Sequence, residues 1–69
     1  MTISNSDKLT IIEGKIKSSE YSLYSVEIDL QLENANTEKD QEAIDVLNTR
    51  ISDINAKLSI LNTEKAKLE

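Results

Sequence analysis

Oxygen-bearing side chains alternate along one short stretch near the middle of the chain. They occupy every second position, as Asn34, Asn36, Glu38, Asp40 and Glu42. Such alternation is typical of EF-hand calcium loops, which also need a leading Asp, a Gly at the sixth position and a Glu at the twelfth. Those three positions here hold Asn34, Lys39 and Asp45. The stretch therefore predicts a polar turn, and we expect no metal and no cofactor.

The residue types that most enzymes use are missing. The sequence contains neither Cys nor His, which removes the usual ligands of zinc, haem and iron–sulfur clusters. Serine and threonine are plentiful, but no histidine or glycine-rich turn is present to activate a hydroxyl as a nucleophile. We therefore expect a protein that is not an enzyme and that acts by binding.

Apolar residues recur in alternating steps of three and four in both halves of the chain, the heptad spacing of coiled coils. These residues form a seam: Leu9, Ile12, Ile16, Ser19, Leu23, Val26, Leu30, Ile44, Leu47, Ile51, Ile54, Leu58, Leu61 and Leu68. Ser19 interrupts the first series, and we interpret it as a small residue that bonds to its own helix. Lys65 interrupts the second series close to its end, where its side chain can extend to water.

A polar stretch separates the two series and predicts a turn. Its side chains compete for backbone hydrogen bonds and so disfavour helix. Thr37 followed by Asp40 predicts a capping box for the second helix, and Ser4 followed by Asp7 predicts a similar start for the first. Folding the second series back on the first pairs Leu30 with Leu47, so that the seam closes between antiparallel helices.

The predicted fold is all-α, a single domain over residues 1–69. It is an antiparallel coiled-coil hairpin with a helix over about 4–34, a turn over about 35–40 and a helix over about 41–68, assembled into a helical bundle. One long bent helix in a larger oligomer has the same heptads and remains an alternative. A chain of 69 residues without disulfide or metal usually needs a partner subunit.

Residues 25–34 alternate strictly between apolar and polar, which is the usual pattern of a strand. On a helix the same residues form two apolar faces, one along the seam and one nearly opposite. The second face predicts a partner interface consisting of Tyr21, Tyr24, Ile28 and Leu32, extended by Val46. A strand shared within an oligomer remains the alternative for this stretch.

Charge is concentrated around the predicted turn. The chain carries a net charge of −5, and residues 27–45 hold seven carboxylates against one lysine. Such a centre repels nucleic acid, and the acidic flanks of the apolar faces disfavour membrane binding. We also find no apolar run long enough to span a bilayer and no signal peptide, so the expected location is cytoplasmic.

Three segments resemble small proteins encoded by marine tailed bacteriophages. They are "NSDKL", "SSEYSLYSVEIDLQLENA" and "LNTRISDINAKLSILNTEKAKLE", which together cover most of the chain. The shared features are a first helix with tyrosines, an Asn-rich bend and a coiled-coil second helix. The resemblance brings no assigned activity, but it implies a phage product that acts by binding, in the host cytoplasm or in the virion.

These observations favour a non-enzymatic structural or interaction protein, a self-associating hairpin such as a dimer of hairpins. It would act as an assembly factor, a virion component or an adaptor. The alternative is a small effector or inhibitor that binds one host protein through Tyr21, Tyr24, Ile28 and Leu32.

Overall fold

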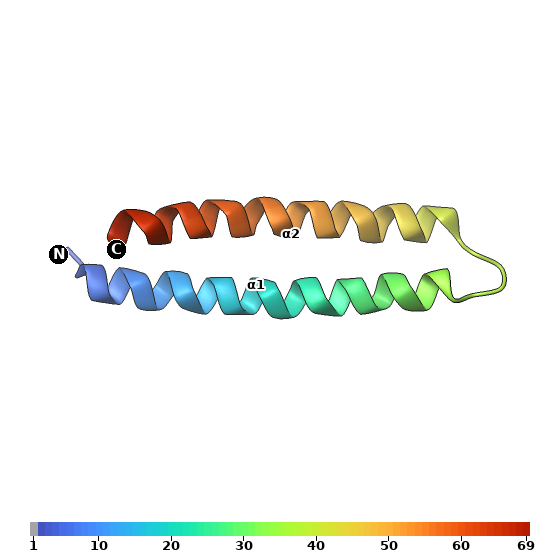
Figure 1. The fold of residues 1–69 in the computed structure, drawn as a ribbon, viewed down its shortest axis with the longest axis horizontal. Helices are drawn as coiled ribbons and strands as arrows, with labels where there is room; N and C mark the ends of the chain where they lie inside the picture. The colour runs from blue at the N-terminus through green and yellow to red at the C-terminus, as the bar shows by residue number, and fades with distance from the viewer. Residues whose placement is uncertain (1) are drawn as a thin grey trace.

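A computed structural model describes residues 2–69 of the chain. It contains two helices, α1 (Asn5–Asn34) and α2 (Gln41–Leu68), and no strand among the described residues. The helices pack side by side with both chain ends at one end of the molecule and the connection at the other (Figure 1). The all-α two-helix hairpin expected from the sequence is thus confirmed. The single bent helix is excluded, and residues 25–33 are helical.

Side-chain caps explain where both helices begin. The hydroxyl of Ser4 accepts a hydrogen bond from the Asp7 amide at 3.1 Å, as expected for the first helix. The cap of α2 differs from expectation, because Asp40 and not Thr37 is the N-cap. Its carboxylate accepts from the amides of Glu42 and Ala43 at 3.1 and 3.2 Å. The side chain of Asp40, directly before the helix, therefore caps α2 in place of the capping box predicted from Thr37.

The end of α1 is a tightened last turn without glycine. Ala35 donates to the carbonyl of Gln31 at 3.1 Å, and Asn36 donates to that of Glu33 at 3.2 Å. The second bond spans three residues, the 3₁₀ spacing that often closes a helix. The six-residue connection to α2 is exposed throughout and, apart from Ala35, polar.

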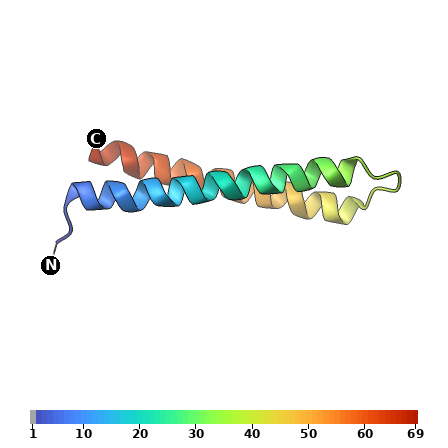
Figure 2. The same ribbon diagram turned by 90° about the horizontal axis from the view of Figure 1, so that it is seen from below.

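The molecule is long and thin. Its principal extents are 55 × 20 × 15 Å and its radius of gyration is 16.1 Å, whereas a compact domain of this length has about 11 Å. Figure 2 shows the helices crossing at a shallow angle near mid-length. A rod two helices wide has no interior in which a side chain can be surrounded on all sides, so most apolar residues remain partly exposed.

Candidate protein-interaction surfaces

Every side chain along the predicted seam is buried or half-buried. Ile44, near the start of α2, is 7% exposed and is the one buried residue among residues 2–69. The other seam residues are half-buried, from Leu9 to Leu30 in α1 and from Leu47 to Leu68 in α2. The helices therefore meet along a stripe that is covered on one side by the opposite helix and open at its edges.

The two polar interruptions of the seam behave differently. Ser19 is half-buried, and its hydroxyl makes no hydrogen bond within residues 2–69, so the expected bond to its own helix is missing. It lines a groove between the helices instead. Lys65 is half-buried along its stem, and its ammonium reaches the carboxylate of Glu69 at 3.8 Å.

Apolar contact holds the helices together. All side-chain hydrogen bonds and ion pairs of residues 2–69 join residues no more than four positions apart in the chain. In the described part of the chain, none links α1 to α2. Direct polar pairing therefore does not fix the register of the two helices, and the seam residues must do so.

Within residues 2–69, three of the open grooves lie between the helices. The turn groove is lined by Asp29, Leu32, Glu33, Asn36, Asp40, Glu42, Ala43, Val46, Leu47 and Arg50. The middle groove is lined by Lys15, Ser18, Ser19, Lys57, Ile60 and Leu61. The end groove is lined by Ile3, Lys8, Ile11, Ile12, Glu64 and Leu68.

All three grooves lie along one side of the hairpin, which we call the grooved face. In α1, Lys8, Lys15 and Asp29 are whole heptads apart, and each lines a different groove. In α2, Arg50, Lys57 and Glu64 are also spaced by heptads and contribute one residue to each groove. Because the seam has the same repeat, residues at this spacing keep one position relative to the opposite helix.

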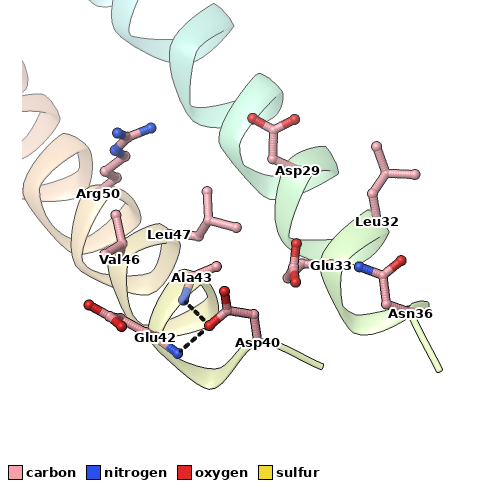
Figure 3. A pocket seen from close by; sticks show the side chains of 10 residues that line it. All are labelled: Asp29, Leu32, Glu33, Asn36, Asp40, Glu42, Ala43, Val46, Leu47 and Arg50. Atoms are coloured by element: carbon pink, nitrogen blue, oxygen red, sulfur yellow. Dashed lines mark hydrogen bonds between the residues drawn. The ribbon is translucent and has the colours of Figure 1, made fainter. Parts of the chain in front are cut away.

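Figure 3 shows the turn groove from close by. Glu33 and Leu47 lie between the two helices, while Asp29 and Arg50 stand on opposite helices at the rim. The carboxylate of Asp40 is engaged by the amides at the start of α2. The groove therefore combines the apolar side chains of Leu32, Val46 and Leu47 with four carboxylates and one arginine.

The predicted partner interface is divided by the structure. Leu32 and Val46 come together in the turn groove. Tyr21, Tyr24 and Ile28 line none of these three grooves, and we call these three residues the tyrosine face.

The tyrosine face lies on the outer side of α1. Tyr21 and Tyr24 are 68% and 67% exposed. Ile28 is half-buried although it points away from the seam, because the residues four positions before and after it on the helix flank its side chain. The ammonium of Lys17 stands 5.8 Å from the centre of the Tyr21 ring, within the range of a cation–π contact.

Sequence reasoning missed three exposed apolar residues, Ile3, Ile11 and Ile60. All three line grooves. A signal was present, since Ile11 lies three heptads before Leu32 and Ile60 lies two heptads after Val46. These four residues lie in an outer row on each helix of the grooved face, in which Ser18, Ser25 and Asp53 occupy the intervening heptad positions.

The polar side chains of residues 2–69 form no metal-binding cluster, and the threonine hydroxyls bond to their own helices. Thr10, Thr49 and Thr63 each donate their hydroxyl to the carbonyl four residues earlier. No group of three or more carboxylate, imidazole or thiolate side chains in the described chain could hold a metal ion. Neither helix of that part is long and apolar enough to cross a membrane. The remaining candidate functional features are the grooved face and the tyrosine face.

Comparisons with family models, with curated proteins and with solved structures find no match to this chain.

Proposed function

We propose that this chain is a non-enzymatic interaction protein whose hairpins self-associate, through coiled-coil packing, into a helical bundle. The observation that carries this proposal is the lack of a closed interior. Ile44 alone is buried among residues 2–69, and it is still 7% exposed, while the rest of the seam stays half-buried. Packing against a second hairpin would cover the open edges of the seam and complete a four-helix core.

The size of the surface supports the same proposal. The hairpin exposes 5282 Å², whereas a folded monomer of its mass, 7.7 kDa, exposes about 4,300 Å². Among the exposed side chains are large apolar ones that are costly to leave in water: Ile3, Ile11, Tyr21, Tyr24, Leu32, Val46 and Ile60. Association would remove part of this apolar surface from solvent.

The role we propose for such a bundle is in assembly, as an assembly factor, a virion component or an adaptor. This part rests on the resemblance to small phage proteins, with the host cytoplasm or the virion as the proposed location. The acidic turn would remain accessible at the tip of each hairpin and would disfavour nucleic acid as a partner.

A second candidate function rests on the tyrosine face. Tyr21 and Tyr24 are among the most exposed large side chains of the described chain, and tyrosine is enriched at protein interfaces. The face lies on α1 alone, outside the grooves, so it remains available whether or not the grooved face is covered. It would suit a small effector that captures one host protein.

The deciding experiment is the molar mass in solution, measured by light scattering from low to high protein concentration. We expect twice the chain mass or more at high concentration, falling towards a monomer on dilution. A folded monomer at all concentrations would contradict self-association and would favour the effector. In that case, binding of a host protein should be lost with Tyr24→Glu and retained with Ile60→Glu, a substitution at a similarly exposed residue.

A further inference from the structure

The grooved face carries apolar residues on both of its helices. Ile11 and Leu32 of α1 are 50% and 63% exposed, and Val46 and Ile60 of α2 are 47% and 64% exposed. Leu32 and Val46 share the turn groove, so the two rows flank the grooves from opposite helices. A partner two helices wide would cover both.

Charge changes sign along the same face. The end and middle grooves together contain three lysines, Lys8, Lys15 and Lys57, and one carboxylate, Glu64. The turn groove contains four carboxylates, from Asp29, Glu33, Asp40 and Glu42, and one cation, Arg50. The face is therefore basic towards the chain ends and acidic towards the turn.

This polarity makes the face complementary to a copy of itself in one orientation only. Two hairpins that face each other with their turns at the same end would set acid against acid and lysine against lysine. Reversing one copy end for end places each turn groove beside the lysines of the other copy. Complementary potentials favour such an arrangement and suppress the like-charged one.

We propose that the grooved face binds a second copy of this chain and that the two hairpins run in opposite directions. The proposal rests on the self-association proposed above and assigns its surface and orientation. A two-fold axis perpendicular to the hairpin relates the copies, so that one set of contacts is made twice. The tyrosine faces stay on the outside of this dimer, exposed to solvent.

The available area is sufficient for a stable dimer. The broad side of the hairpin measures 55 by 20 Å, and a standard interface needs about 800 Å² from each partner. The tyrosine face is less suited to a second copy, because it lies on one helix and lines none of the three grooves described above for residues 2–69.

Orientation can be measured directly, because the chain has no cysteine. A single Thr37→Cys variant places one spin label at the exposed turn, where Thr37 makes no side-chain hydrogen bond within the described chain. In the proposed dimer, pulsed electron paramagnetic resonance should find one distance between the two spin labels, near the 55 Å length of the hairpin. A distance within the 20 Å width of the hairpin would mean parallel turns and would overturn the orientation.

The surface is tested with two matched substitutions. Ile60→Glu on the grooved face should raise the dimer dissociation constant at least about tenfold. Tyr24→Glu, at a residue of nearly equal exposure on the tyrosine face, should change it by no more than about twofold. Circular dichroism of both variants checks that the hairpin remains folded.

The outcomes separate the two proposals. Dissociation by Tyr24→Glu and not by Ile60→Glu would overturn the grooved face as the interface and leave self-association standing. A monomer of unchanged mass at every concentration would refute both.

Discussion

Asp40 shows how one residue decides where α2 begins. The segment before this helix contains two residues that could cap it, Thr37 and Asp40, and the spacing of the first matches a capping box. The structure selects Asp40, whose carboxylate accepts from two backbone amides at once, those of Glu42 and Ala43. Thr37 lies in the connection and caps nothing. Local spacing favoured Thr37, because the residue three positions after Asp40 is alanine, which cannot complete a capping box.

Replacing Asp40 tests this assignment. We expect Asp40→Ala to lower the free energy of unfolding by about 1 kcal/mol, because two amides lose their acceptor. Asp40→Asn should retain most of the stability, since an amide oxygen can also cap. The measurement is urea denaturation followed by circular dichroism. Thr37→Ala is the control and should leave the midpoint almost unchanged, whereas a larger loss there would restore Thr37 as the cap.

At the scale of the two helices, the heptad pattern was enough to predict much of the fold. The bounds of both helices lie within one residue of expectation, because polar turn residues and side-chain caps act locally. The grooved face was not predicted, because it depends on how residues of different helices combine. Ile11 and Ile60 are far apart in sequence, so neither residue indicates a shared surface by itself. They lie on one side of the molecule only once the two helices pack together. Ile28 and Tyr24 were predicted as interface residues because both lie in α1, so their spacing within one helix is enough to indicate a common face.

Ile44 is the residue on which the pairing of the helices should depend most. As it is 7% exposed, we expect Ile44→Ala to lower the free energy of unfolding by about 2 kcal/mol or more. Ile60→Ala removes the same atoms at a residue that is 64% exposed and should cost less than about 0.5 kcal/mol. Denaturation is measured at a concentration low enough to keep the chain monomeric. Equal losses would mean that the helices pair differently.

At the scale of the whole molecule, the distribution of charge matters more than the total. The net charge of −5 opposes any association between copies. Within the grooved face, however, the lysines and the carboxylates lie at opposite ends. Reversing one copy in the proposed dimer would convert part of this repulsion into attraction. The charge pattern therefore predicts the orientation of the two copies.

A charge exchange tests that link without any label. In the proposed reversed dimer, Lys15 of one copy would lie towards Asp29 of the other, and symmetry would make this contact twice. Lys15→Glu should therefore weaken self-association at low salt by about fivefold. Mixing Lys15→Glu with Asp29→Lys should restore binding as a heterodimer, detected by native mass spectrometry. Lys17→Glu is the control, because this substitution makes the same charge change at a residue outside the three grooves. If it weakened the dimer as much as Lys15→Glu, total charge and not its placement would govern association.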